Sequence, residues 1–324
     1  MQDLIAVVDL GATKILSGIA TTQGQILVRE KFPTLKEKGP EDIIERICHS
    51  IRELARLCGD CETQIAGAAM AAPGPISYPE GVVVDSPNLA WARVPLKDEL
   101  SKRLAKPVIV DKDTNLAALG EYCFGRQAQP RSLLYITVST GIGGGIILDG
   151  QIWRGQNGGA GEIGHMVVEP RGRICNCGRR GCLEAMASGA AIKDSVEKLR
   201  QRGKGMGILV AGNAKNGLGA FEVAAAARQG DAEAQTIINR VIKYLGRGVV
   251  NLVNIFNPEL VVLGGGVAQG WQDLILEDLK HYVKKEAFAL NTQNLNIEIT
   301  ELGEDIVLYG CITAARQYFK GELI

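Results

Sequence analysis

The pattern of apolar and polar positions predicts an α/β protein in which strands and helices alternate. Short apolar runs of the kind that form buried strands occupy residues 4–10, 14–20, 25–30, 65–71 and 108–110. Apolar residues recur at helical spacing over residues 41–57 and 96–104. The first strand ends at Gly11 and the fourth at Pro73-Gly74-Pro75, where the chain is expected to turn.

The second half of the chain repeats this order of elements. A strand at 133–138, a glycine-rich turn at 140–145 and a strand at 146–148 lead through the hairpin signal Asp149-Gly150 to a third strand at 151–153. Helices are predicted at 237–254 and 305–319, and a strand at 260–263 runs into Gly264-Gly265-Gly266. A duplication about 130 residues apart predicts two similar α/β lobes, residues 1–120 and 121–324. Two unrelated β-meanders are the alternative.

Composition narrows the class of protein. The chain has 36 basic and 36 acidic residues, and this zero net charge argues against a nucleic-acid partner. We find no run of about 18 apolar residues and no signal peptide before the first strand, so we expect a cytoplasmic protein without a membrane partner. The eight cysteines are then expected to be reduced, and to bind metal or fill the core.

A cluster of cysteines supplies the strongest local signal. Cys175, Cys177 and Cys182 fall within eight residues, and His165, one of only three histidines, lies ten residues upstream. Three cysteines and one histidine are a common tetrahedral zinc set, and four protein ligands make a structural site. A disulfide is the less favoured alternative.

The remaining cysteines are read differently. Cys58 and Cys61 form a Cys-x-x-Cys pair near Cys48, which we interpret as core or surface thiols, with a second metal site as the alternative. Cys123 and Cys311 are expected to fill the core.

Glycine turns at strand ends are candidate phosphate sites. The segment Asp9–Lys14 places a carboxylate, exposed backbone N–H groups and a hydroxyl after a strand, and Thr140–Gly143 repeats the design. Gly264–Gly266 is a third candidate at a strand end. None is a P-loop. Two such turns, one per lobe, suggest a nucleotide held in a cleft between the lobes.

Asp113 follows a strand and precedes an apolar helical run. Alone, it is best interpreted as a helix N-cap. The alternative is a general base that takes a proton from an attacking hydroxyl, as an aspartate does in phosphoryl transfer.

Taken together and in order, these motifs resemble the ROK family (repressor, open reading frame, kinase) of bacterial sugar kinases over nearly the whole chain. The matching segments are Asp9–Thr13, Ala72–Pro75, Pro87–Leu89, Asp113–Asn115, Ser139–Gly145, Glu162–His165, Cys175–Glu184 and Val262–Val267. The resemblance implies a two-lobed, actin-like (ribonuclease H-like) fold with duplicated βββαβα lobes. The last helix, residues 305–320, is expected to pack back on the first lobe.

The resemblance also implies roles for individual residues. Asp113 would be the catalytic base that activates a hexose hydroxyl, usually O6. Glu162, His165 and Glu184 would hydrogen-bond the sugar, whereas taken alone the two glutamates are solvated surface carboxylates. His165 would give one ring nitrogen to zinc and the other to the sugar. The pocket would be lined by Gly74 and Asn88.

On the nucleotide side, the resemblance implies ATP as phosphoryl donor. The phosphates would bind at Asp9, Gly11, Ala12, Thr13, Lys14, Thr140, Gly141 and Gly143, and the adenosine at Gly264, Gly265 and Gly266. Asp9 would orient Mg²⁺ through water. A homodimer or homotetramer is the expected assembly.

Lys112 departs from the family pattern. Many glucokinase-like members have asparagine before the catalytic aspartate, as a ligand of the sugar. A lysine there donates but cannot accept, and its charge favours the ionised form of Asp113. Either it alters the hexose preference, or it points to solvent and leaves the preference unchanged.

We therefore expect an ATP-dependent hexokinase, with glucose as first choice. The alternatives are N-acetylglucosamine, N-acetylmannosamine, mannose or fructose as substrate, and a sugar-binding module without activity. A repressor is less favoured, because the first strand begins at Leu4 and leaves no room for a preceding helix-turn-helix.

Overall fold

The computed structural model describes residues 4–127, 129–211 and 218–320. It divides into two compact units, neither continuous in sequence. Unit 1 comprises Met1–Pro130, Gly145–Ala160 and Glu301–Ile324, and unit 2 comprises Arg131–Gly144 and Gly161–Thr300. The division at residue 120 that the sequence suggested stays a prediction.

Unit 1 is built on a five-stranded sheet of order β3-β2-β1-β4-β8. Its strands are β1 (Leu4–Leu10), β2 (Lys14–Thr21), β3 (Ile26–Pro33), β4 (Ile65–Ala72) and β8 (Val108–Lys112). β1 runs antiparallel to β2 and parallel to β4, which is parallel to β8. The central strands are almost entirely buried, as expected for a sheet with helices on both faces.

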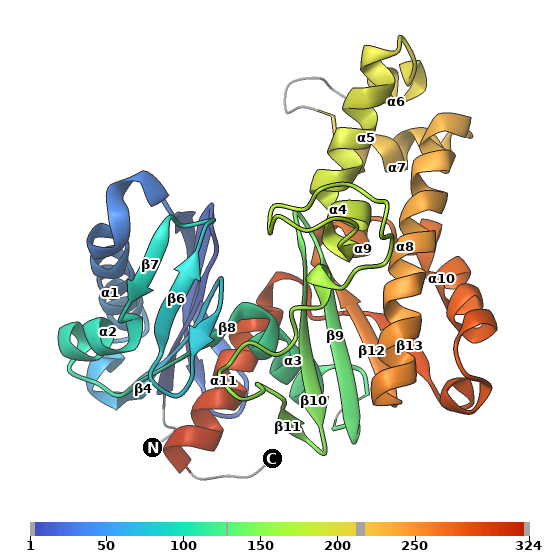
Figure 1. Ribbon diagram of the computed structural model, residues 1–324. Helices are drawn as coiled ribbons and strands as arrows, with labels where there is room; N and C mark the ends of the chain where they lie inside the picture. Colours follow the sequence, from blue (N-terminus) through green and yellow to red (C-terminus); the bar gives the residue numbers. More distant parts are fainter. Residues whose placement is uncertain (1–3, 128, 212–217, 321–324) are drawn as a thin grey trace. The chain divides into compact units, whose positions relative to one another are not determined.

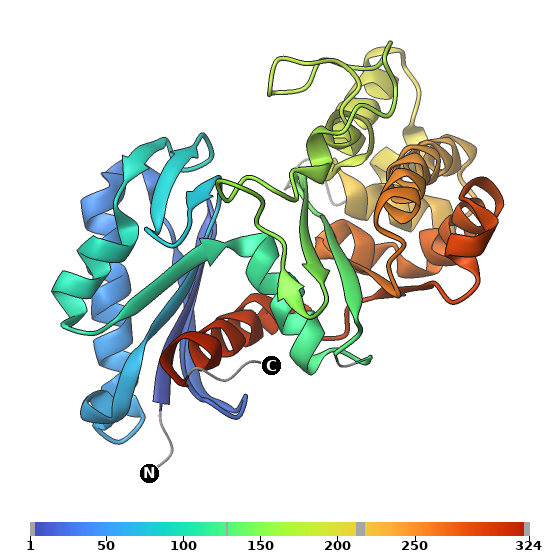
Figure 2. The ribbon, with the colours of Figure 1, turned by 60° about the horizontal axis from the view of Figure 1, so that its bottom comes forward.

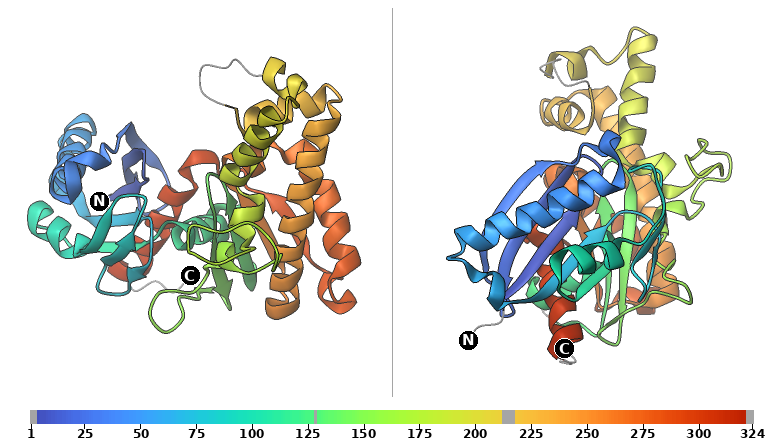
Figure 3. Two further views of the ribbon diagram at one scale, coloured as in Figure 1. Left: turned by 45° about the horizontal axis from the view of Figure 1, so that its top comes forward. Right: turned by 90° about the vertical axis from the view of Figure 1, so that its left-hand side faces the viewer.

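Helices cover both faces of this sheet. The apolar stripe of α1 (Gly39–Leu57), with Ile43, Ile47 and Leu54 at most 2% exposed, packs on one face beside α2 (Leu96–Leu104). Figure 2 shows α11 (Ile306–Lys320) on the opposite face, and in the right-hand view of Figure 3 α1 crosses in front of the strands. The helix α11 therefore packs on the first sheet, against β1 and β4.

The helix α3 (Asp113–Phe124) packs against α11 through two glycines. A Cβ on Gly120 would lie 2.1 Å from the carbonyl oxygen of Ile306, and one on Gly310 would lie 1.7 Å from that of Leu116. The two backbones therefore approach more closely than any side chain at these positions would permit.

A small antiparallel sheet, β5-β6-β7, completes unit 1 and was not predicted. It comprises β5 (Ile76–Ser77), β6 (Val82–Ser86) and β7 (Trp91–Val94), which are too short for a clear alternating pattern. Trp91 and Val83 are buried in the core shared with α1.

The second five-stranded sheet has the order β11-β10-β9-β12-β13, the same scheme as the first. Its strands are β9 (Ser132–Val138), β10 (Ile142–Leu148), β11 (Gln151–Ile152), β12 (Leu260–Gly264) and β13 (Asn296–Ile299). β12 is parallel to both β9 and β13. The matching order supports the duplication inferred from the sequence.

Helices make up most of the rest of unit 2. They are α4 (Leu183–Ala187), α5 (Gly189–Gln201), α6 (Met206–Ala211), α7 (Ala220–Arg228), α8 (Ala232–Phe256), α9 (Gly265–Gly270) and α10 (Gln272–Glu286). α8 and α10 lie beside the second sheet (Figure 1), while α5, α6 and α7 gather around the first half of α8 (Figure 3, left). In the part of the chain that the structure describes, no helix is long and apolar enough to cross a membrane.

Most predicted elements are found within a few residues of their expected bounds, but the glycine-rich turn at 140–145 was predicted too long. The turn spans Ser139–Gly141, and Gly143–Gly145 belong to β10. These glycines serve close packing: a Cβ on Gly145 would lie 2.2 Å from the carbonyl oxygen of Thr114, and one on Gly144 2.5 Å from the side chain of Ile163.

Candidate active site

In unit 1, three candidate segments lie at one edge of the first sheet. Asp9 on β1 is in register with Ala71 on β4, which is in register with Asp111 on β8. The carboxyl ends of these parallel strands therefore lead directly into Gly11, Gly74 and Asp113. The crevice beyond such strand ends is where α/β sheets bind ligands.

The turn between β1 and β2 is tight and is held by hydrogen bonds at Gly11. Gly11 donates its N–H to the carbonyl of Lys14 (3.0 Å), and its own carbonyl accepts from the hydroxyl of Thr34 (2.7 Å). Gly11 has no room for a side chain, because a Cβ would lie 2.8 Å from the Lys14 carbonyl oxygen. Ala12 is half-buried and Thr13 is exposed, so the Thr13 hydroxyl is available to a ligand.

Asp9 carries a strongly perturbed carboxyl. Burial, and after it the negative charge of Asp113, raise its pKa to about 7, while Lys14 acts in the opposite direction. A small cavity of about 40 Å³ lies against Asp9, Gly11 and Lys14. A carboxyl that shares a site with a second carboxylate is poised to accept a cation, because a bound cation would favour ionisation of both.

Lys14 is held by an acidic partner. Its ammonium lies 3.2 Å from the Glu304 carboxylate, which also binds Lys31 at 2.7 Å. These side chains are 45–61% exposed, so the ion pairs leave Lys14 free to exchange partners.

Asp113 is the first residue of α3, and the N-cap position falls one residue earlier, at Lys112, without a side-chain capping bond. The Asp113 carboxylate accepts the N–H of the next residue, Thr114 (2.7 Å). The N-cap interpretation of Asp113 is thus wrong. Its carboxyl is half-buried at the sheet edge.

Lys112 is buried, with 5% of its surface exposed, and donates from Nζ to the carbonyl of Ala160 (2.8 Å). The alternative in which this side chain points to solvent is therefore wrong. Burying an ammonium is costly unless it is hydrogen-bonded, so the loop at Ala160 and the side chain hold each other in place.

Gly74 and Asn88 lie in the loops that follow β4 and β6. Gly74 has a φ of +105°, and a Cβ there would lie 2.3 Å from the carbonyl oxygen of Asp85, so only glycine fits. Asn88 is exposed in the turn between β6 and β7.

A buried ion pair beside this edge was missed by sequence reasoning. Asp111 accepts from Arg154 (Nη2 2.8 Å, Nε 2.9 Å) and from the Asn115 amide (2.9 Å), and the Arg154 guanidinium stacks 3.9 Å from the centre of the Tyr78 ring. Arg154 lies 43 residues after Asp111, and Tyr78 lies 33 residues before it. Asp111 stands near the end of a strand, as many residues do, so no local sequence pattern could have connected the three. They line a cavity of about 160 Å³ in unit 1.

In unit 2, the Ser139–Gly141 turn is braced by Glu184. The Glu184 carboxylate accepts the N–H of Ile142 (3.0 Å), and a Cβ on Gly141 would lie 2.4 Å from its Oε2. Glu184 is half-buried, so its interpretation as a solvated surface carboxylate is wrong. Thr140 is exposed at the tip of the turn, and its carbonyl accepts from Ala190 at the start of α5 (3.1 Å).

Gly264, Gly265 and Gly266 adjoin the same turn. Gly264 pairs with Thr137 in the register of β12 and β9, and a Cβ on Gly265 (φ +85°) would lie 2.6 Å from the Val138 carbonyl oxygen. A Cβ on Gly266 would meet nothing within 4 Å. The structure therefore brings together the two glycine segments assigned to unit 2.

The predicted metal ligands converge in unit 2. The ligand atoms of His165, Cys175, Cys177 and Cys182 all lie within 4.8 Å of one another. Cys175 Sγ is 3.6 Å from His165 Nδ1, and the sulfurs of Cys177 and Cys182 are also 3.6 Å apart. Tetrahedral Zn–S bonds of about 2.3 Å place neighbouring ligand atoms roughly 3.7 Å apart, close to the two separations of 3.6 Å, so the four side chains fit a tetrahedral zinc ion.

Local turns shape this cluster. Cys175 donates its N–H to the carbonyl of Arg179 (2.7 Å), and Gly178 and Gly181 have positive φ angles of 85° and 74°. A Cβ on Gly181 would lie 1.7 Å from the Glu169 carbonyl oxygen. We call residues 173–182, a tight hairpin closed by the pairing of Ile174 with Arg180, the knot hairpin.

The pKa values of two thiols in the cluster are shifted in opposite directions. Burial raises the pKa of Cys182 to about 12, whereas the backbone N–H of Arg179 lowers the pKa of Cys177. A divalent cation favours the thiolate at every position.

His165 directs its Nδ1 toward Cys175, which leaves Nε2 for another partner. Cys175 Sγ also lies 4.0 Å from the Glu184 carboxylate. Glu162 is exposed, and its carbonyl accepts the His165 N–H (3.1 Å) at the start of the short helix Ile163–His165. Glu184, two residues after Cys182, therefore lies beside the metal cluster.

The other cysteines lie apart from this cluster. Cys48, Cys61 and Cys311 are buried, and Cys58 and Cys123 are half-buried. Among the residues that the structure describes, the only group of this kind that could hold a metal is the one containing His165.

Comparisons with known proteins identify the family of this chain. The family model described as "ROK family" matches residues 5–317. The chain is 40% identical to a glucokinase from Thermotoga maritima, over 97% of this chain and 98% of that protein. It is 32% identical to a xylose repressor from Caldicellulosiruptor bescii, over 94% of this chain and 76% of that protein.

A solved structure also matches over nearly the whole chain. The crystal structure of a ROK family glucokinase from Streptomyces griseus, in complex with glucose and AMPPNP, superposes with a TM-score of 0.81 and 30% identity, over 97% of this chain and 99% of that one. The fold is thus the two-lobed, actin-like α/β fold of ROK sugar kinases, as the motifs predicted. The chain belongs to the ROK family.

Proposed function

We propose that this protein is an ATP-dependent hexokinase that transfers the γ-phosphoryl group of ATP to the 6-hydroxyl of glucose. The observation that supports this most directly is the grouping of Asp9, Gly74 and Asp113 at the carboxyl edge of the first sheet. The nearly full-length similarity to a protein named glucokinase supports the choice of sugar.

Asp113 is assigned as general base. Its carboxylate lies at the carboxyl edge of the first sheet, accepts the Thr114 N–H and is half-buried, and from this position it can take a proton from an attacking hydroxyl. Gly74, Asn88 and Lys112 are assigned to the sugar from unit 1, and Glu162, His165 and Glu184 from unit 2. Lys112 would contribute through the loop at Ala160, which its ammonium holds.

ATP is assigned to the two backbone turns. The phosphates would bind Gly11, Ala12, Thr13 and Lys14 of unit 1 and Thr140, Gly141 and Gly143 of unit 2, and the adenosine would bind Gly264–Gly266. Exposed N–H groups and hydroxyls at strand ends suit phosphate oxygens. Asp9 would hold Mg²⁺ through water, and the ion's charge would keep Asp9 ionised.

Zinc is assigned to His165, Cys175, Cys177 and Cys182 as a structural ion. Four protein ligands leave no open position, so the ion would take no part in the reaction. It would fix the tautomer and direction of His165, whose Nε2 then donates to or accepts from the sugar. A homodimer or homotetramer is still the assembly that the family resemblance predicts.

The proposed base is tested by Asp113→Asn, which keeps the shape of the side chain and removes its basicity. We expect kcat with glucose to fall by roughly 10²–10⁴-fold with little change in the binding of ATP. Asp98→Asn is the matched control, since Asp98 is an exposed carboxylate in the first turn of α2. Near-normal turnover of Asp113→Asn with every accepted sugar would refute the assignment.

Substrate identity is tested with a coupled assay over hexoses and N-acetylhexosamines. Glucose is expected to give the highest kcat/KM, and a preference for N-acetylmannosamine, N-acetylglucosamine, mannose or fructose would move the assignment within the same reaction class. Sugar-dependent binding to DNA in a gel-shift assay, without turnover of any sugar, would instead favour a regulatory function like that of the repressor relative.

A further inference from the structure

Unit 2 contains a pocket of about 400 Å³ that the proposed reaction does not use. It lies between α5 and the first half of α8, closed at one side by residues 202–204 and at another by the side chain of Arg173. None of the residues assigned to sugar, nucleotide or zinc lines it. Its volume is that of a site for a small metabolite.

Positive charge dominates the lining of this pocket. Five basic side chains contribute, and the single carboxylate is Glu233, whose Oε2 already accepts the N–H of Gly205. The basic residues are Arg173, Lys198, Arg202, Lys204 and Arg240.

Little of this charge is neutralised by the protein. Asp194, outside the pocket, is the partner of both Lys198 (2.8 Å) and Arg173 (3.1 Å). Arg202, Lys204 and Arg240 form no ion pair within residues 4–127, 129–211 and 218–320. Like charges held together repel each other, and this repulsion falls when an anion binds between them.

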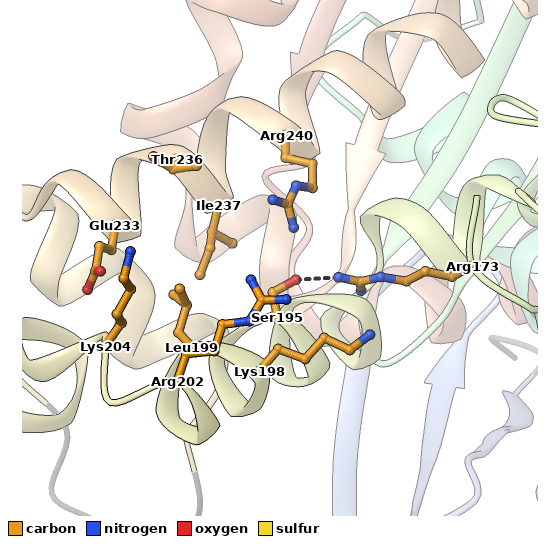
Figure 4. Close-up of a pocket in the computed structure, with 10 residues that line it drawn as sticks. All are labelled: Arg173, Ser195, Lys198, Leu199, Arg202, Lys204, Glu233, Thr236, Ile237 and Arg240. Atoms are coloured by element: carbon orange, nitrogen blue, oxygen red, sulfur yellow. Dashed lines mark hydrogen bonds between the residues drawn. The ribbon is translucent and has the colours of Figure 1, made fainter. Parts of the chain in front are cut away.

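The guanidinium groups lie at one end of the pocket. Figure 4 shows Arg202 and Arg240 directed into the same space as the Arg173 fork, beside Ser195, whose hydroxyl oxygen accepts from Arg173 Nη2 (2.9 Å). Arg173 also donates from Nη1 to the Ala191 carbonyl (2.7 Å), so its position is fixed before any ligand arrives. Guanidinium groups arranged in this way suit the oxygens of a phosphate group.

The other end of the pocket has a different character. Leu199 and Ile237 form an apolar wall between the arginines and a second polar pair, Lys204 and Glu233. A bare phosphate ion would fill only the arginine end. An organic group attached to the phosphate could lie along Leu199 and Ile237 and reach a donor or acceptor at the far end.

We propose that this pocket binds a small phosphate ester, with the phosphate at Arg173, Arg202 and Arg240 and the organic part over Leu199 and Ile237. The inference does not depend on the kinase assignment. Arg173 also begins the knot hairpin, where its carbonyl accepts from Gly181 (2.8 Å), so an occupied pocket would restrain the backbone that carries the proposed zinc ligands.

The test is isothermal titration calorimetry of the full-length, zinc-loaded protein without Mg²⁺, with glycerol 3-phosphate and inorganic phosphate as probes. We expect saturable binding of both, tighter for the ester and weaker as NaCl is added. In the variant Arg202→Gln/Arg240→Gln the dissociation constant should rise at least about tenfold, since two charge-assisted hydrogen-bond donors are lost. Both side chains are exposed, so the variant should fold.

Two control variants separate this pocket from other anion sites. Lys193→Gln/Arg200→Gln removes the same charge from exposed positions of α5 outside the pocket, and its affinity should stay within about twofold of the wild type. Thr140→Val alters a proposed nucleotide turn and should leave the affinity unchanged. The proposal is overturned if neither probe binds in the millimolar range, if the α5 control loses as much affinity as the pocket variant, or if only Thr140→Val weakens binding.

Discussion

At the scale of single residues, the raised pKa of Asp9 makes the stability of the fold depend on pH. Its pKa is raised from 3.8 to about 7 in the folded protein, chiefly by burial. The folded state therefore binds a proton between about pH 4 and pH 7 that the unfolded chain has released. Stability should fall as the pH rises through this window and level off above it.

Asp9→Asn removes the carboxyl group whose ionisation lowers the stability of the fold in this pH window. We expect the variant to be more stable than the wild type at pH 8, by at most about 4 kcal/mol, with the difference shrinking below pH 7 and vanishing near pH 4. Urea unfolding at several pH values measures this, with Asp98→Asn as the exposed control. Kinase activity should be lost, because the proposed Mg²⁺ site needs the carboxylate. A constant stability difference across the pH range would contradict the raised pKa.

Gly141 tests how Glu184 supports the turn. A methyl group at Gly141 would lie 2.4 Å from the Glu184 carboxylate, so Gly141→Ala must displace that carboxylate from the Ile142 N–H. We expect KM to rise for both glucose and ATP, since both are assigned to these residues. Gly270→Ala is the control, because a Cβ there meets nothing within 4 Å. Equal kinetics for the two variants would mean that the turn tolerates the displacement.

At the scale of elements, the knot hairpin links the metal cluster to the candidate sugar ligands. His165 is itself one of the four candidate ligands and Glu184 lies 4.0 Å from Cys175, whereas the nucleotide turns at Gly11 and Gly264 belong to strand ends that need no metal. Removing the metal should loosen the first group, and with it the Thr140–Gly141 turn that Glu184 braces, but should spare the turns at Gly11 and Gly264.

Chelation tests this separation. After zinc removal from folded protein, we expect the affinity for glucose to fall at least tenfold while the affinity for AMPPNP changes less than about threefold. Calorimetry with each ligand gives both values, and re-addition of zinc should restore glucose binding. Normal glucose affinity in zinc-free, folded protein would break the proposed link.

Elements differ in how far the sequence predicts them. The metal cluster was predictable because its ligands lie close together in sequence and sulfur chemistry restricts their use. The strands β1, β4 and β8 were predictable from apolar runs, but β10 was placed four residues too late, because Gly143–Gly145 resemble a turn and instead admit the Thr114 backbone and the Ile163 side chain. The N-cap interpretation of Asp113 failed because capping depends on a side-chain direction that residue type does not determine.

At the scale of the whole molecule, the buried pair of Asp111 and Arg154 ties the returning segment 145–160 to the rest of unit 1. Asp111 is 3% exposed at its side chain and Arg154 22%, so loss of one partner leaves a charge poorly solvated. Such long-range pairs, like the basic pocket, escape sequence reasoning because only the fold brings their members together.

Asp111→Asn should lower the free energy of unfolding by about 3 kcal/mol. The matched control is Glu301→Gln, which breaks the exposed pair with Arg126 and should cost less than about 0.5 kcal/mol. The shift in urea midpoint measures both. A loss for Asp111→Asn no larger than that of the control would show that Arg154 finds other partners.

The close packing of α3 on α11 has a consequence for biosynthesis. The ribosome makes β1 before the main part of unit 2 and α11 after it, yet α11 covers the sheet to which β1 belongs. Until α11 has been made, the nascent chain therefore carries one uncovered apolar face, which is the kind of surface that chaperones bind. Unit 2, complete at Thr300, can fold while unit 1 still waits for its final helix, and limited proteolysis of ribosome-stalled chains would reveal that order.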